Sequence, residues 1–218
     1  MPRSMRAANR QTLPPDPTKT TKFPRTIRRA ERIAHVLARR QPDLTVVLEN
    51  VHDPHNIGAV LRSCDAVGIM SVHTIYSVEE RPTRAYARST SGSASKWIEI
   101  HHHDSVEECY PKLRSDGFRI LVTALTDQSV ELYDTTLTAP SAIVFGNEKR
   151  GASDEAIAEA DGEILIPMMG MVESLNISVA CAVTLFEALR QRRAAGRYDQ
   201  PSLPEPRLTQ MQLDWLTR

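Results

Sequence analysis

Polar residues that could take part in chemistry gather in three stretches of this sequence, and one arginine stands out in the first. Arg62 follows Asn56 by six positions and comes directly after the apolar pair Val60-Leu61. A guanidinium carries five N–H donors and no acceptor, so Arg62 is a poor general base at neutral pH. It is suited instead to holding a phosphate and stabilising a developing oxyanion. The alternative is an ordinary surface or salt-bridged arginine.

The second stretch is a polar turn that follows an apolar run. Residues 142–145 are expected to form a buried strand, which leads directly into the segment from Gly146 to Gly151 with Glu148 inside it. Open α/β sheets bind ligands beyond the carboxyl ends of their strands. This turn is therefore a candidate ligand-binding loop. The alternative is a plain turn before a helix that begins near Ser153.

The third stretch combines a strand, a loop and the start of a long apolar helix. A strand is expected over residues 164–166, and Gly170 in the following loop permits a close backbone approach. Ser174 is expected to be the N-cap of the helix, with Leu175 and Asn176 in its first turn and their backbone donors free. In the first stretch, Asn56 is expected to cap a helix in the same way. The polar residues of the third stretch could also serve as caps alone.

Short β-branched runs alternate with helical segments from Leu44 onward. Strands are expected at 44–48, 72–76, 97–100, 119–123, 142–145 and 163–166. Helices are expected at 56–66, 105–113, 154–159 and 174–192. This alternation predicts an α/β fold with a mostly parallel sheet and helices on both faces.

The two ends of the chain differ from its middle. Residues 1–24 are rich in proline and basic side chains, which predicts a mobile basic arm. From residue 26 the apolar positions recur at helical spacing, with an arginine-rich outer side made of Arg28, Arg29, Arg32, Arg39 and Arg40. Residues 25–195 would form the main domain, and 196–218 an extension. Its stretch 208–216 could form a short helix that docks on the body or on a partner, or a frayed tail.

Charge is divided unevenly although the net charge is zero. Residues 1–40 carry 11 Lys and Arg against 2 Asp and Glu, residues 41–189 carry 10 against 22, and residues 190–218 carry 6 against 3. Basic ends are typical of chains that hold a polyanion, because neutralising phosphates supplies much of the affinity for nucleic acid. The alternative is that the ends are merely solvated.

Several classes of protein and site are not favoured. The longest apolar stretch has 13 residues, from Ile177 to Leu189, against about 20 for a membrane span. With no apolar signal segment at the amino end, a cytoplasmic location is the default. The sequence contains neither of the glycine-rich motifs that bind dinucleotides or nucleoside triphosphates.

Cysteine, histidine and methionine do not indicate chemistry at this stage. The three cysteines are too widely spaced for a disulfide framework or zinc ligands and are expected to be structural thiols: Cys64, Cys109 and Cys181. Consecutive side chains at a strand end point to opposite sides, so His101 to His103 cannot easily converge on one ion and are expected in a solvated loop. Met168 and Met169 are expected to fill gaps in the core.

Together, residues 50–62, 143–151 and 166–179 resemble the three signature motifs of the SpoU branch of the SPOUT RNA methyltransferases, and the likeness covers residues 25–195. The runs 37–45 and 167–176 are similar to those of members that act on tRNA. The resemblance implies a carboxyl-terminal trefoil knot and a homodimer whose sites lie at the two-fold interface. It also implies S-adenosylmethionine as methyl donor and the ribose 2'-hydroxyl of a tRNA nucleoside, guanosine 18 in the D-loop, as acceptor.

The resemblance also implies roles for individual residues. Backbone groups at four positions would hold the cofactor: Thr123, Gly146, Ile166 and Leu175. The catalytic residues would be Arg62, Asn56, Glu148, Ser174 and Asn176. Under our hypothesis, an RNA phosphate clamps Arg62, which stabilises the 2'-alkoxide. Glu148 could hold either Arg62 or Asn56 in place. No metal is expected, since a sulfonium already makes its methyl group electrophilic.

Two alternatives to tRNA methylation stay open. The substrate could be another RNA such as 23S rRNA, although the resemblance implies that rRNA-modifying members usually carry a separate amino-terminal RNA-binding domain. The 24 proline-rich residues at the start of this chain are too few for one. The chain could also be an RNA-binding module without turnover, which the matching polar residues of the three motifs disfavour.

Overall fold

The sheet at the centre of the molecule has seven strands in the order β3-β2-β1-β6-β4-β7-β5. The computed structural model describes residues 25–78 and 94–218, so the expected basic arm over 1–24 lies outside the described residues. The strands are β1 (Leu44–Glu49), β2 (Ser71–Ile75), β3 (Glu99–His103), β4 (Arg119–Thr123), β5 (Val130–Glu131), β6 (Ser141–Phe145) and β7 (Gly162–Leu165). Every pairing between them is parallel. The expected parallel α/β sheet is confirmed.

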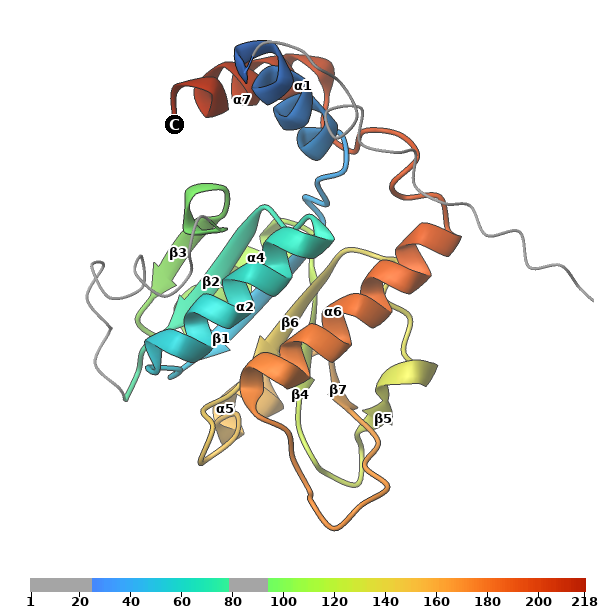
Figure 1. Ribbon diagram of the computed structural model, residues 1–218. Coiled ribbons are helices and arrows are strands. Elements are labelled where there is room, and N and C mark those ends of the chain that lie inside the picture. The colour runs from blue at the N-terminus through green and yellow to red at the C-terminus, as the bar shows by residue number, and fades with distance from the viewer. Residues whose placement is uncertain (1–24, 79–93) are drawn as a thin grey trace, which may run out of the picture.

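Helices cover both faces of this sheet, as expected (Figure 1). The α-helices of the described residues are α1 (Arg25–Leu37), α2 (Pro54–Val67), α4 (Val106–Ser115), α5 (Asp154–Ala158), α6 (Ile177–Ala194) and α7 (Glu205–Thr217). Helices α2 and α6 pack on each other and share a core with one face of the strands. Helices α4 and α5 share a second core with the other face. The apolar runs of the central strands follow from this cover, because a strand buried on both faces has no polar side.

Helices α1 and α7 form a pair beyond the end of the sheet (Figure 1). Ile33 and Leu37 of α1 and Trp215 of α7 make a small core of their own. The carboxyl-terminal stripe is therefore a docked helix and not a frayed tail. Arg40 does not belong to an outer basic side: it is buried and donates to Asp65 Oδ1 at 2.6 Å and to Ile69 O at 2.7 Å.

Three local expectations are corrected. Strand β3 runs through His103, so the histidines are not a solvated loop: they pair in register with β2, and His103 is buried. The two-residue strand β5 was missed because its exposed residues carry no apolar pattern. Helix α6 begins at Ile177, three residues later than expected. None of the helices in residues 25–78 and 94–218 is long and apolar enough to cross a membrane.

Candidate active site

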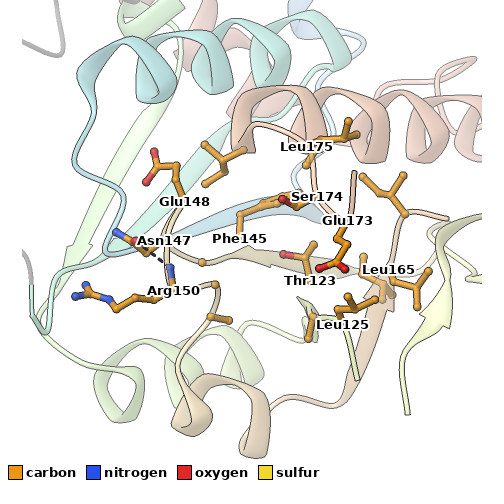
Figure 2. A pocket seen from close by; sticks show the side chains of 18 of the residues that line it. Thr123, Leu125, Phe145, Asn147, Glu148, Arg150, Leu165, Glu173, Ser174 and Leu175 are labelled. Carbon is orange, nitrogen blue, oxygen red and sulfur yellow. Dashed lines mark hydrogen bonds between the residues drawn. The ribbon is translucent and has the colours of Figure 1, made fainter. Parts of the chain in front are cut away.

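A cavity of about 680 Å³ opens at the carboxyl ends of three neighbouring strands, β4, β6 and β7. The three segments that supply it are far apart in the sequence: the end of β4, the turn after β6, and the loop between β7 and α6. All four residues expected to hold a cofactor line it: Thr123, Gly146, Ile166 and Leu175. Two of the five expected catalytic residues, Glu148 and Ser174, line it as well. Figure 2 shows Glu148 at one side of this cavity and Leu125 and Leu165 at the other.

The turn after β6 is held in a single shape by a buried asparagine. Asn147 and Gly151 exchange two backbone hydrogen bonds of 2.9 and 2.8 Å, and the amide of Asn147 donates to Asn50 O at 2.8 Å. A Cβ on Gly146 would lie 2.0 Å from the backbone nitrogen of Ala152, so only glycine fits there. Sequence reasoning missed Asn147. Its position inside the glycine-bounded turn that follows a buried strand was the available signal.

A chain of side-chain hydrogen bonds joins the three motifs beside the cavity. The Asn56 amide nitrogen donates to Glu148 Oε1 at 2.8 Å. The Asn176 amide nitrogen donates to Asn56 Oδ1 at 3.2 Å, and Asn176 Oδ1 accepts from the backbone N–H of Ser178 at 2.9 Å. The side-chain amides of Asn56 and Asn176 therefore each donate through the nitrogen and accept through the oxygen. The sequence left open whether Glu148 holds Arg62 or Asn56 in place, and the structure shows its hydrogen bond with Asn56.

The residues that cap the helices differ from those expected from the sequence. Because Asn56 does not cap α2, its side chain can take part in the hydrogen bonds just described. Asp53 is the N-cap of α2, with its carboxylate accepting from His55 N at 2.9 Å, and Pro54 occupies the first turn. Asn56 therefore lies inside the helix and does not cap it. At α6 the N-cap is Asn176 and not Ser174. Ser174 thus lies in the loop before the helix, where it lines the cavity.

Thr123 lines the cavity at the end of β4. Its hydroxyl donates to Val144 O at 2.9 Å and so links β4 to β6.

The methionines of the loop before α6 were expected to fill gaps in the core. Met169 is 91% exposed, so that expectation is wrong for it, whereas Met168 lines the cavity.

Within one copy of the chain, the position of Arg62 differs from that of the other expected catalytic residues. It lies on the exposed side of α2 with His55 and Ala66, and it is absent from the cavity lining. It is about 9 Å along the helix axis from Asn56, given a rise of about 1.5 Å per residue. Asn56 and Asn176 also stay outside the cavity lining and reach it through Glu148.

The sequence of this chain is similar to those of known proteins. The family model described as the SpoU rRNA Methylase family matches residues 43–186. The tRNA (guanosine(18)-2'-O)-methyltransferase of Thermus thermophilus is 50% identical over 195 residues, covering 89% of this chain and 98% of that protein. The Escherichia coli (strain K12) protein of the same name is 45% identical over 179 residues, covering 81% of this chain and 77% of that protein.

Solved structures agree with these sequence matches. The A. aeolicus TrmH/SpoU tRNA modifying enzyme has a TM-score of 0.79 and 34% identity, covering 88% of this chain and 96% of that one. The SpoU methyltransferase AviRb from Streptomyces viridochromogenes, in complex with the cofactor AdoMet, has a TM-score of 0.60 and 26% identity, covering 72% of this chain and 59% of that one. The motifs, the fold and the near full-length relatives lead to one conclusion: this chain belongs to the SpoU rRNA Methylase family.

Proposed function

We propose that this chain methylates the ribose 2'-hydroxyl of guanosine 18 in tRNA, with S-adenosylmethionine as methyl donor. The observation that carries the proposal is the 50% identity, over 98% of its length, to a tRNA (guanosine(18)-2'-O)-methyltransferase. The geometry supports it, because three polar segments far apart in the chain come together beside one cavity. Such a role agrees with the expected cytoplasmic location.

The cavity fits an adenosine-type cofactor. Its volume of about 680 Å³ lies in the usual range for small-molecule sites. Its lining includes apolar side chains suited to flank a base: Leu125, Phe145, Ile166 and Leu175. It also includes polar side chains: Thr126, Glu148 and Ser174. S-adenosylmethionine would supply an electrophilic methyl group there, because its positively charged sulfur activates the attached carbon. Thr123, Gly146, Ile166 and Leu175 would hold it through their backbones.

The side chains around the cavity would align the acceptor ribose and handle its proton. Ser174 and Asn176 would orient the sugar and its phosphate, and Glu148 would fix Asn56 through the hydrogen bond already described. The Arg62 guanidinium, clamped by an RNA phosphate, would stabilise the negative charge that develops on the 2'-oxygen. A phosphate oxygen or a water molecule would accept the proton, since Arg62 itself has no acceptor.

A homodimer would complete the site. Helix α6 exposes apolar side chains in its first three turns, where Val179 and Phe186 are about half exposed in one copy. Exposed apolar patches often mark interfaces, so this part of α6 is suited to a second copy. The exposed Met169 and Met171 in the preceding loop extend the same apolar surface. Arg62 would then act on cofactor bound by the partner.

The ends of the chain would gather the tRNA. Arg28, Arg29 and Arg32 lie exposed on α1, which packs against α7, and their charge complements phosphate. We also propose the carboxyl-terminal trefoil knot that the family resemblance implies, with residues 25–195 as the methyltransferase domain and 196–218 as an extension. Arg192 on α6 bonds to Asp43 and to Leu137, two segments far apart in the sequence, and so ties this helix to the chain ahead of β1 and β6.

Labelled methyl transfer separates this function from its alternatives. The purified full-length chain is incubated with labelled S-adenosylmethionine and either unmodified tRNA or a 23S rRNA transcript. We expect label in tRNA and none in rRNA. Transfer to rRNA alone would replace the tRNA proposal with rRNA methylation. Tight cofactor binding without transfer to either RNA would indicate an RNA-binding module.

Replacing Asn56 with aspartate should lower the turnover number about 10²-fold. The new carboxylate would face Glu148 where the amide now donates at 2.8 Å, so the two charges repel and the acceptor site shifts. Because Asn56 is not part of the cavity lining, the dissociation constant for the cofactor should stay within about 2-fold of wild type. Single-turnover transfer and cofactor titration measure the two quantities. His55→Ala, on the neighbouring exposed side of α2, is the control, and equal losses in both variants would contradict the role of Asn56.

A further inference from the structure

A buried cluster of two histidines and a cysteine lies on the α4 side of the sheet, at the edge formed by β2 and β3. It consists of His73 on β2, His103 on β3 and Cys109 on α4, which are 4%, 5% and 0% exposed. One potential ligand atom from each residue lies within 4.8 Å of the other two. Strands β1 and β6 separate this edge from β4 and β7, so the cluster is independent of the proposed methyl-transfer site.

The two imidazoles face each other through nitrogen atoms. His73 Nδ1 lies 3.0 Å from His103 Nε2, and the two rings are nearly parallel. Without a cation, one nitrogen must carry a proton and donate it to the other. With a cation, both could offer lone pairs. Zinc bonds of about 2.0 to 2.1 Å at tetrahedral angles place two nitrogens about 3.3 Å apart, so the observed pair needs only a small opening.

The surroundings of His103 match those of a metal ligand. Its Nδ1 is buried without a hydrogen-bond partner and lies 3.6 Å from Glu108 Oε1. A histidine that binds a metal through one nitrogen usually donates its other N–H to a carboxylate. Coordination through Nε2 places the proton on Nδ1, which faces Glu108. The nearby cation Lys112 is paired with Asp116 at 3.3 Å.

We propose that His73, His103 and Cys109 bind a divalent transition-metal ion of borderline softness, with Zn²⁺ as the first candidate. Two imidazole nitrogens and one thiolate suit zinc, whereas Mg²⁺ and Ca²⁺ require oxygen ligands. The ion replaces the Cys109 thiol proton, which passes to solvent, and both imidazoles stay neutral. It links the edge strand β3 to β2 and α4 and would stabilise this edge of the sheet.

The protonation states of the free residues are compatible with this exchange. Burial lowers the pKa of His73 to about 3, so its imidazole is neutral and its lone pair is available. Burial also lowers the pKa of His103. Burial raises the pKa of Cys109 to about 12, so the thiol keeps its proton until a cation displaces it. The competing interpretation is a metal-free imidazole pair that joins β2 to β3 by one hydrogen bond.

Cobalt titration separates these two interpretations. Full-length protein is stripped with a chelator and titrated with Co²⁺, whose complexes with thiolates show a charge-transfer band and whose tetrahedral complexes show strong d–d bands. We expect both bands to saturate at one ion per chain and to disappear when Zn²⁺ is added. Zn²⁺ should also raise the thermal unfolding midpoint of the stripped protein. Absence of the charge-transfer band in wild type would overturn the proposal.

Matched variants identify the ligands. Cys109→Ser should abolish the charge-transfer band, lower the apparent affinity at least about 10-fold and remove the thermal shift. His103→Asn should lower the affinity similarly while a weak thiolate band remains. Cys181→Ser, which removes another buried thiol in the core beneath α6, should leave the band and the affinity unchanged. A band that survives in Cys109→Ser, or one lost in Cys181→Ser, would contradict the assignment. These readouts do not involve methyl transfer, so their outcome does not depend on whether the proposed function is correct.

Discussion

Replacing Arg62 with alanine should lower the turnover number for methyl transfer about 10²- to 10³-fold, as removal of an oxyanion-stabilising donor does in other enzymes. The cofactor's dissociation constant should stay within about 2-fold of wild type, because the proposed role of Arg62 is to stabilise the 2'-oxygen of the acceptor and not to bind the cofactor. Single-turnover transfer to tRNA and cofactor titration measure the two values. A loss of cofactor affinity equal to the loss of turnover would contradict the assigned role.

Two further substitutions sharpen the test. Arg62→Lys keeps the charge but loses the planar fork that binds a phosphate in a bidentate manner, so it should recover little turnover. If Arg62→Lys binds RNA equally well and retains most activity, the phosphate clamp is ruled out. Arg114→Ala is the control, because Arg114 is a partly exposed arginine on α4, on the opposite face of the sheet. It should leave turnover unchanged.

Subunit mixing tests whether Arg62 acts on the partner's cofactor. Gly146→Ala should close the cavity, because its Cβ would overlap backbone at Ala152. In a heterodimer with an Arg62→Ala subunit, one site would combine an intact cavity with an intact Arg62 from the other subunit. Mixing the two inactive variants should therefore restore about a quarter of wild-type activity at random pairing. No restoration, despite proven heterodimers, would place Arg62 and its cofactor in the same subunit.

Replacing Arg192 with methionine should lower the free energy of unfolding by about 3 to 5 kcal/mol, the usual result of removing one partner of a buried ion pair. Arg192 is 0% exposed. Its guanidinium donates to Asp43 Oδ1 at 2.6 Å and to the carbonyl oxygens of Leu137 and Ala139, each at 2.9 Å. Those backbone acceptors would be left buried and unsatisfied. Denaturant unfolding at a fixed protein concentration measures the loss.

Arg190 provides a matched control two residues earlier on the same helix. Its side chain is mostly exposed and pairs with Glu187 at 2.7 Å. Solvent screens the Arg190 guanidinium, and the buried Glu187 carboxylate keeps the hydrogen bond that Gln191 donates at 2.9 Å, so Arg190→Met should cost less than Arg192→Met. Similar losses in the two variants would show that helix propensity, and not the buried network, accounts for the effect.

Much of the fold was predictable because its signals are local. The apolar runs of β1, β4 and β6 are buried on both faces, and such strands have a recognisable sequence pattern. The helix starts were less predictable because capping residues compete. Asp53 with Pro54 outcompetes Asn56 at α2, since proline needs no hydrogen-bond acceptor in the first turn. The displaced Asn56 becomes the link between Glu148 and Asn176.

Long-range contacts account for what the sequence could not indicate. Nothing local places His73 beside His103, because their contact depends on the register between β2 and β3. The rule that successive strand residues point to opposite sides was sound for His102 and His103. It did not anticipate ligands from a neighbouring strand and from Cys109 on α4. The exposure of Met169 likewise depends on the shape of a loop that periodicity does not describe.

The position of the transferred methyl group tests the central claim most directly. Alkali cleaves RNA by attack of the 2'-oxygen, so a methylated ribose leaves one linkage intact. After transfer to unmodified tRNA, the account predicts a single alkali-resistant linkage that directly follows guanosine 18, and no label in a tRNA whose nucleotide 18 is 2'-deoxyguanosine. Label on a base, at another nucleotide, or in the deoxy-substituted tRNA would contradict it.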